Sequence, residues 1–214
     1  MKAHPPRVRI HAAMDAKENV ARIAQAPVDE AFTDRWSPRS FSPDPLSELQ
    51  IRTLFEASRW APSCFNEQPW IYIYAVRNED RQRFLSLLTE KNRSWARNAP
   101  LLLFIATRLH FSKNGKPNRS AEFDAGSAWM SLALCARRLG LYAHAMAGFD
   151  RKRCYDVLRV PEDRYKVMAA IAVGRKDAAS KLPEDLRKDE YPSDRKPLER
   201  MCCEGEFGEE AHHG

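Results

Sequence analysis

The apolar run from Ala99 to Ala106, APLLLFIA, constrains the fold of this 214-residue chain more than any other segment. It is far shorter than the roughly 20 residues that a helix needs to cross a bilayer. Its uncharged Leu, Phe and Ile residues are typical of a buried strand, which we place at Leu101–Thr107. Trp70–Val76 and Lys166–Gly174 also have the composition of strands. The chain is therefore expected to build a small sheet that other elements cover.

Helical segments separate these strands. The expected helices run from Asp44-Pro45 to Ala61-Pro62, from Glu79 to Glu90, from about Ser120 to Leu139, and from Arg151 to Leu158. The third of them ends before Gly140, the residue type that a left-handed helix cap prefers. Long helices that alternate with few strands outside hairpins indicate an α+β sandwich.

Both ends of the chain are polar. Residues 1–28 form an N-terminal arm that ends near Pro27, and residues 176–214 form a Pro-rich C-terminal tail. Each has too little apolar content to fold alone, and such lengths are unusual in a compact domain unless they lie on something. We expect one domain over residues 29–175, with the tail packed on a partner subunit.

Charge and cysteine content exclude several classes of protein. The net charge is +6, but Lys and Arg are interleaved with Asp and Glu, so no nucleic-acid partner is expected. The first 24 residues contain no continuous apolar core, which argues against a secretory signal and a membrane location. Five Cys without framework spacing favour a reducing, cytoplasmic compartment. Adjacent Cys202-Cys203 and terminal His212-His213 do not have the spacing of a metal site, so none is expected.

The segment Arg35-Trp36-Ser37-Pro38-Arg39 places two guanidinium groups and a hydroxyl within five residues. Such a set can bind a phosphate, because Arg offers planar forked donors and Ser adds a hydroxyl donor. The same pattern also fits a solvated basic turn. Alone, the segment leaves both interpretations open.

A second informative segment, Pro62–Trp70, lies between the helix that Pro62 ends and the strand that Trp70 begins. Asn66 can both donate and accept hydrogen bonds, which suits the edge of a planar heterocycle. An ordinary polar loop is the alternative. A reactive thiol needs a base or a cationic setting, and none can be assigned to Cys64 from sequence. We therefore interpret Cys64 as a small residue packed against a ligand.

Together these segments resemble the FMN-dependent nitroreductase family. The resemblance begins with RWSPRSF at Arg35 and RWAPSCFNEQPW at Arg59, and it extends over residues 30–198 in the family's order and approximate spacing. It continues through Asp124-Ala125-Gly126, Met146–Asp150 and Val173-Gly174. It implies an α/β/α sandwich with a central, mainly antiparallel sheet, in an intertwined homodimer with a C-terminal extension.

The resemblance also implies how domain 29–175 holds FMN. Arg35 and Ser37 would hold the phosphate, and Arg39 would lie near the pyrimidine oxygen, where a fixed positive charge stabilises reduced flavin. Arg195 and Lys176 are weaker candidates. Residues 62–66 would reach the ring from the partner subunit. The full expected set is Arg35, Trp36, Ser37, Arg39, Pro62, Ser63, Cys64, Asn66, Met146, Ala147, Gly148, Gly174 and Arg175.

The implied activity is reduction of small electron-poor acceptors, such as nitroaromatics or quinones, by NAD(P)H. FMN performs hydride transfer itself, so no catalytic side chain is nominated. NAD(P)H would reduce FMN and leave before the acceptor enters the same cavity, in a ping-pong reaction. Two alternatives remain open: a flavin-binding protein of the same fold with a storage, sensing or non-reductive role, and a flavin-free basic binding module.

Overall fold

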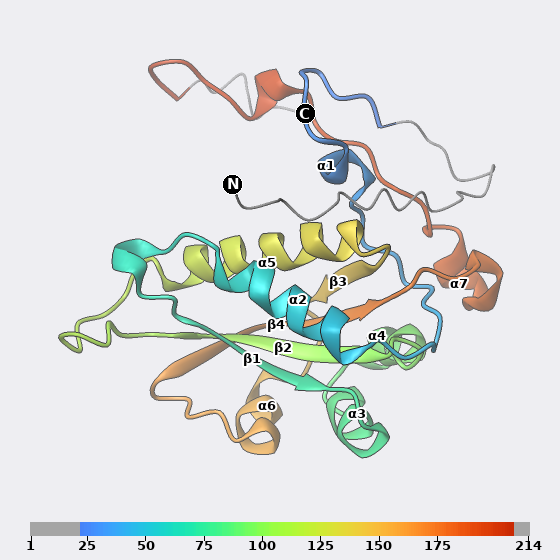
Figure 1. Ribbon diagram of the computed structural model, residues 1–214, viewed down its shortest axis with the longest axis horizontal. Helices are drawn as coiled ribbons and strands as arrows, with labels where there is room; N and C mark the ends of the chain where they lie inside the picture. Colours follow the sequence, from blue (N-terminus) through green and yellow to red (C-terminus); the bar gives the residue numbers. More distant parts are fainter. Residues whose placement is uncertain (1–21, 208–214) are drawn as a thin grey trace, which may run out of the picture.

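The computed structural model describes residues 22–207, which form a four-stranded antiparallel sheet with helices on both faces (Figure 1). The strands, in the spatial order β1-β2-β4-β3, are β1 (Trp70–Ala75), β2 (Leu101–Arg108), β4 (Tyr165–Gly174) and β3 (Tyr142–Met146). The helices are α1 (Glu30–Asp34), α2 (Glu48–Arg59), α3 (Asn78–Leu85), α4 (Glu90–Ala96), α5 (Ala121–Arg138), α6 (Arg151–Leu158) and α7 (Glu184–Arg187). The expected α+β sandwich with an antiparallel sheet is confirmed.

Strand β2 is buried on both faces, as its uninterrupted apolar sequence predicts. Alternate side chains of a strand point to opposite faces of the sheet. Leu101, Leu103 and Ile105 pack in the core beneath α2 and α5. Leu102 and Phe104 pack in the other core, beside the side chains of α3 and α4. One apolar run therefore supplies the centre of two hydrophobic layers.

Helices α2 and α5 cover one face of the sheet (Figure 1). The hydroxyl of Ser58 in α2 donates to the carbonyl of Ala128 in α5 and lies 2.6 Å from the hydroxyl of Tyr72 in β1. Helix α2 begins at Glu48, later than the expected start at Asp44-Pro45. The reason is a capping box, in which Ser47 and Gln50 satisfy each other's backbone N–H groups.

The single helix expected over Glu79–Glu90 is wrong. Helix α3 ends at Leu85, and a separate helix, α4, begins at Glu90. Leu88 pairs with Phe149, and the backbone N–H of Thr89 donates to the carbonyl of Gly148. These contacts with a distant segment supply the hydrogen bonds that continued helix would otherwise provide.

The chain turns after α5 at Gly140, whose φ of +71° confirms the expected left-handed cap. It then enters β3, a strand that the sequence did not predict. Tyr142–Met146 forms an edge strand that pairs with β4. The segment is short and lacks a continuous apolar run, so its composition alone does not distinguish a strand from a loop.

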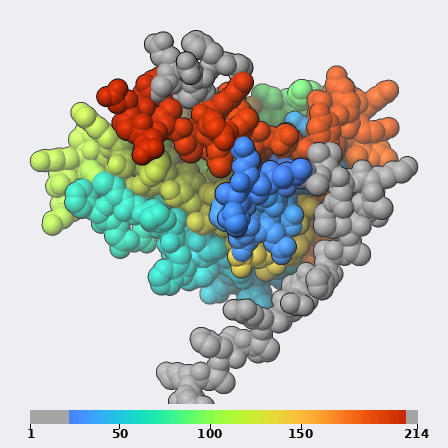
Figure 2. Space-filling view, turned by 90° about the horizontal axis from the view of Figure 1, so that it is seen from above, coloured from blue at the N-terminus to red at the C-terminus, as the bar shows by residue number. Residues whose placement is uncertain are grey.

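The described part of the tail runs back along the N-terminal segment of the same chain, and Figure 2 shows the two on one face of the molecule. Arg22 donates to the carbonyl of Ser193, and the backbone N–H of Leu198 donates to the side chain of Gln25. Packing of the tail on a partner subunit stays a prediction. Most of the expected arm, residues 1–21, and residues 208–214 lie outside the described residues. Within residues 22–207, no helix combines the length and apolar character needed to cross a membrane.

Candidate functional site

A cavity of about 300 Å³ lies between the N-terminal segment and the tail. It contains Arg35 and Ser37, the predicted phosphate contacts, Trp36 and Arg39 from the same predicted set, and the weaker candidate Arg195. Its lining residues are Arg22, Arg35, Trp36, Ser37, Arg39, Asp189, Tyr191, Ser193 and Arg195. The lining therefore includes four arginines, one aspartate and two serines.

The positive charges in this cavity are close enough to affect one another. Burial lowers the pKa of Arg35, and the charge of Arg195 lowers it further. The pKa of Arg22 is lowered first by burial and then by Arg195 and Arg35, while Asp194 and Asp34 partly offset the shift. An anion would relieve this repulsion, because guanidinium groups bind phosphate with paired, charge-assisted hydrogen bonds. The donor set fits the phosphate of a mononucleotide.

Arg22 was not among the predicted site residues. Its guanidinium donates to the carbonyls of Thr33, Arg35 and Ser193 at 2.7–3.0 Å. It therefore joins the tail to the segment that precedes residues 35–39, which we call the phosphate motif because Arg35 and Ser37 are predicted to bind phosphate. The residue lies in a polar stretch with no motif around it, so the sequence offered no signal for this role.

A buried carboxylate fixes the backbone of the phosphate motif. Glu190 in the tail is 6 % exposed, and its oxygens accept from the backbone N–H of Arg39 at 2.8 and 3.0 Å and from that of Ser40 at 2.8 Å. The hydroxyl of Ser40 donates to the carbonyl of Ala178. Charge-assisted hydrogen bonds to backbone donors are among the stronger ones in proteins. Glu190 was missed because it lies 151 residues from Arg39.

Two side chains of strand β3 contact the phosphate motif. Trp36 meets Tyr142 edge to face, with ring centroids 6.1 Å apart, and a ring nitrogen of His144 lies 2.9 Å from the carbonyl oxygen of Pro38. Burial lowers the pKa of His144 to about 4, and its ring packs 4.6 Å from that of Trp95. His144 is therefore a packed histidine that stays neutral near pH 7.

The same strand leads from the cavity to Met146, Ala147 and Gly148. At about 3.3 Å per residue, Ala147 lies roughly 16 Å along the chain from Tyr142. The side chain of Met146 is buried in the core, and Ala147 is exposed. Gly148 has no room for a side chain, since a Cβ would lie 2.6 Å from Nδ2 of Asn92. Contact between the backbone of these residues and a cofactor stays a prediction.

Gly174 and Arg175 stand beside the motif and are not among the residues that line the cavity. A Cβ on Gly174 would lie 2.7 Å from Cδ of Pro100 and 3.2 Å from Cδ1 of Phe41. The carbonyl of Arg175 accepts from the backbone N–H of Ser42. Both residues therefore contact the segment that follows the motif, at Phe41 and Ser42. Direct contact of Gly174 or Arg175 with a phosphate stays a prediction.

The segment that contains Pro62, Ser63, Cys64 and Asn66 forms a tight turn, which we call the ring turn (residues 62–68). Phe65, Asn66 and Gln68 have φ values of 51°, 57° and 49°, in the left-handed region. Asn tolerates this region, whereas Phe and Gln pay roughly 1–2 kcal/mol each. Strain of this kind clusters at functional sites. The side chain of Phe65 is 90 % exposed.

Side chains from two other segments hold the ring turn. The backbone N–H of Cys64 donates to Oδ2 of Asp124, a buried residue in the first turn of α5. The carboxylate of Glu67 accepts from the backbone N–H and the hydroxyl of Ser112 at 2.7 and 3.1 Å. The sequence predicted no role for Asp124 within Asp124-Ala125-Gly126. In the structure its carboxylate anchors the ring turn.

Within one chain, the structure does not bring the cavity and the ring turn together. Cys64 lies beside Asp124 at the start of α5, whereas Asp29, just before α1, pairs with Arg138 in the last turn of α5. Asp124 and Arg138 are 14 positions apart in α5, which corresponds to about 21 Å along the helix. Figure 1 shows the two regions at opposite ends of α5. Supply of the ring turn by a partner subunit stays a prediction.

Metal ligands are not grouped in the part of the chain that the structure describes. Within residues 22–207, no group of three or more His, Cys, Asp or Glu could hold a metal ion. Cys202 and Cys203 are exposed free thiols. His212 and His213 lie outside the described residues.

The fold and the cavity define an α+β sandwich with an arginine-lined site suited to an anionic group. The model of the nitroreductase family matches residues 32–93 and 75–175. The chain therefore belongs to the nitroreductase family.

Individual relatives agree with this assignment. A solved structure described as an oxidoreductase containing FMN is 43 % identical, covers 91 % of this chain and 99 % of its own, and superposes with a TM-score of 0.85. A Streptomyces coelicolor protein that carries the name NADH dehydrogenase/NAD(P)H nitroreductase is 29 % identical over 138 residues, 56 % of this chain and 68 % of that protein. A nitroreductase family protein from Streptococcus pneumoniae shares the fold at 20 % identity, with a TM-score of 0.68 over 82 % of this chain and 98 % of its own.

Proposed function

We propose that this chain is an FMN-dependent oxidoreductase that uses NAD(P)H to reduce small electron-poor acceptors, such as nitroaromatics and quinones. The observation that carries the proposal is the cavity that gathers Arg22, Arg35, Arg39 and Arg195 around two serine hydroxyls. The membership in the nitroreductase family and the 43 % identity to an FMN-containing oxidoreductase support it.

In this proposal the residues of the chain divide the work of holding FMN. Arg35 and Ser37 bind the phosphate, with Arg22 and Arg195 adding positive charge. Arg39 lies toward the pyrimidine, where a fixed cation stabilises negative charge without needing to reorganise. When bound, FMN supplies the two-electron hydride chemistry that links a nicotinamide donor to an acceptor. The nicotinamide donor leaves before the acceptor enters the same space beside the flavin ring.

The active form in this proposal is a homodimer with two equivalent sites. Each site takes its phosphate contacts from one chain and its ring contacts, Pro62, Ser63, Cys64 and Asn66, from the other. The distance along α5 between the two regions supports this arrangement, because a single chain separates them by most of a long helix. The cytoplasmic location that the cysteine content predicts remains a prediction.

Anaerobic titration of the purified, FMN-reconstituted protein with NADH and NADPH tests the function. We expect the visible flavin absorbance to bleach with one equivalent of reductant per site and to return when a quinone or nitroaromatic is added. Yellow protein that neither nucleotide bleaches would favour a storage, sensing or non-reductive role. Protein that stays colourless after reconstitution and binds oligonucleotides with a steep salt dependence would favour a basic binding module.

A further inference from the structure

A second cavity, of about 290 Å³, opens where β2 ends beside the start of β4. Its lining residues are Arg108, His110, Phe111, Ser112, Arg164 and Tyr165. The set combines two guanidinium groups and an imidazole with two aromatic rings. Like the arginine-lined cavity, it combines arginines with two aromatic residues and serine, but its lining includes His110 in place of an aspartate. We call this second space the aromatic cavity.

The cations of the aromatic cavity are only weakly neutralised by their own chain. The guanidinium of Arg108 lies 4.0 Å from Glu67, whose two oxygens already accept from Ser112. The guanidinium also donates to the hydroxyl of Tyr165 at 3.3 Å and lies 5.8 Å from the centroid of that ring. Arg164 lies 4.0 Å from the carboxylate of Asp163, and both side chains are largely exposed. The Arg164 pair is long and exposed, so its guanidinium stays able to bind an anion. The side chain of Arg108 is partly exposed in the same cavity, although the Glu67 carboxylate 4.0 Å away is buried.

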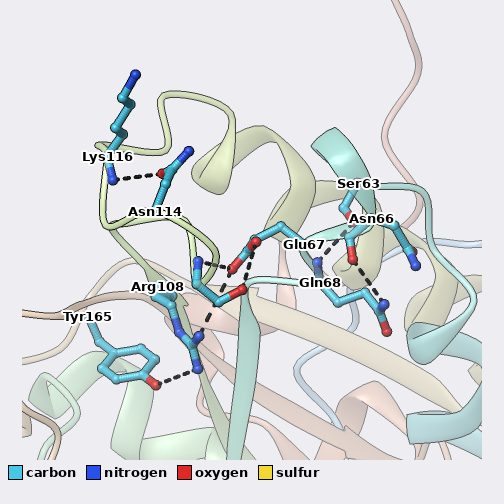
Figure 3. Close-up of polar contacts among 9 residues, drawn as sticks. Ser63, Asn66, Glu67, Gln68, Arg108, Asn114, Lys116 and Tyr165 are labelled. Atoms are coloured by element: carbon cyan, nitrogen blue, oxygen red, sulfur yellow. Dashed lines mark hydrogen bonds and ion pairs between the residues drawn. The ribbon is translucent and has the colours of Figure 1, made fainter.

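The aromatic cavity adjoins the ring turn. Glu67 links the turn to Ser112, and the rings of Phe65 and Phe111 meet edge to face with centroids 5.9 Å apart. Figure 3 shows Ser63, Asn66 and Gln68 on one side of Glu67, with Arg108 and Tyr165 on the other. A planar molecule that packs between the rings of Phe111 and Tyr165 would therefore lie next to the residues proposed to contact the flavin ring.

We propose that the aromatic cavity binds the carboxylate end of a planar aromatic acceptor, which defines the preferred substrates as nitroaromatic acids. This inference rests on the proposed function, because it assigns an acceptor to the same flavin site. In each two-electron step NADH becomes NAD⁺ and gives up a hydride. One further proton comes from water, and the nitro group loses one oxygen as water to become a nitroso group. Arg164 and Arg108 hold the carboxylate, and Phe111 and Tyr165 pack against the ring.

Two acceptors of nearly equal shape test the inference: 4-nitrobenzoate, which is anionic, and 4-nitrobenzamide, which is neutral. The quantity to compare is the ratio of their kcat/KM values, measured with the FMN-loaded, full-length protein. We expect a ratio above one for the unmodified protein. We expect it to fall about 10-fold in Arg164→Gln and at least as much in Arg108→Gln, because a charge-assisted hydrogen bond is lost. Arg164 is exposed, so its variant tests the inference even if Arg108→Gln fails to fold.

Arg83→Gln is the matched control, since Arg83 is an exposed arginine of α3 paired with Asp80, away from both cavities. Its ratio should equal that of the unmodified protein. The inference is overturned if the charged acceptor is not preferred, or if Arg164→Gln leaves the ratio unchanged. It is also overturned if Arg164→Gln changes only flavin reduction by NADH or NADPH, because the anion bound there would then be the nucleotide. Failure of the proposed function looks different: the protein would hold no FMN, or its FMN would not be reduced.

Discussion

The phosphate cavity and the ring turn are both proposed to hold FMN, yet the chain builds them in opposite ways. The cavity brings together segments that are far apart in sequence. The backbone N–H groups of Arg39 and Ser40, for example, donate to the buried carboxylate of Glu190. The ring turn keeps its residues together in sequence, holds three of them at positive φ, and leaves Phe65 almost fully exposed. One chain supplies every residue that lines the cavity, whereas the ring turn is proposed to contact the FMN of the partner subunit.

This difference predicts that the two regions fail in different ways. Damage to the cavity should weaken FMN binding in every chain, in proportion to the contacts removed. Damage to the ring turn should matter only where two chains meet. The following experiments are arranged from the largest expected effect to the smallest.

Dissociation of the proposed homodimer should remove FMN completely, because each monomer would retain only the phosphate contacts. Sedimentation velocity over a dilution series, followed at both protein and flavin wavelengths, measures this directly. Circular dichroism of the diluted sample checks that loss of flavin is not loss of fold. A folded monomer that sediments with one FMN per chain would show that the ring turn acts within its own chain.

Replacing Arg35 with Ala should weaken FMN binding about 10- to 100-fold, since a hydrogen bond to a charged group contributes about 1.5–3 kcal/mol. Quenching of FMN fluorescence on titration with apoprotein gives the dissociation constant. Arg83→Ala serves as the control for loss of a surface arginine. A dissociation constant within twofold of the original would mean that the phosphate lies elsewhere.

Replacing Glu190 with Ala should lower the free energy of unfolding by about 2 kcal/mol, because the backbone N–H groups of Arg39 and Ser40 lose their acceptor. FMN binding should weaken about 10-fold as the motif loosens. Denaturant titration and flavin fluorescence measure the two effects. Glu190→Gln keeps one acceptor oxygen and should show smaller changes in both. Equal changes in the Ala and Gln variants would contradict the role given to that oxygen.

Replacing Cys64 with Ser should change the rate of flavin reduction by less than about twofold. The observed contact at this position is made by the backbone N–H to Asp124, which the substitution preserves. Stopped-flow reduction under anaerobic conditions provides the rate. Folded, yellow Cys64→Ser protein without turnover would show that the thiol takes part in the chemistry.

Sequence patterns predicted what depends on local composition. The apolar run of β2, the cap at Gly140 and the bounds of α6 all follow from neighbouring residues. The break between α3 and α4 and the pairing of β3 depend on contacts with distant segments, and these were missed. Short, alternating segments such as Tyr142–Met146 leave the choice between strand and loop to the surrounding fold.

The candidate site divides in the same manner. Arg35, Ser37 and Arg39 stand out because they lie within five residues, and the structure places all three in one cavity. Arg22 and Glu190 reach that cavity from the arm and the tail, across separations that no local motif records. Asp124 was visible as part of a motif, but its hydrogen bond to Cys64 required the fold.

The carboxylate of Glu190 also sets an order of events during synthesis. All four strands and α5 precede the described tail in the chain, so they are synthesised before it. Glu190 is synthesised after the residues of the sheet, and only then can the backbone N–H groups of Arg39 and Ser40 gain its carboxylate as their acceptor. A product truncated before Glu190 would therefore keep the residues of the sheet but lack the acceptor that fixes the backbone of Arg39 and Ser40.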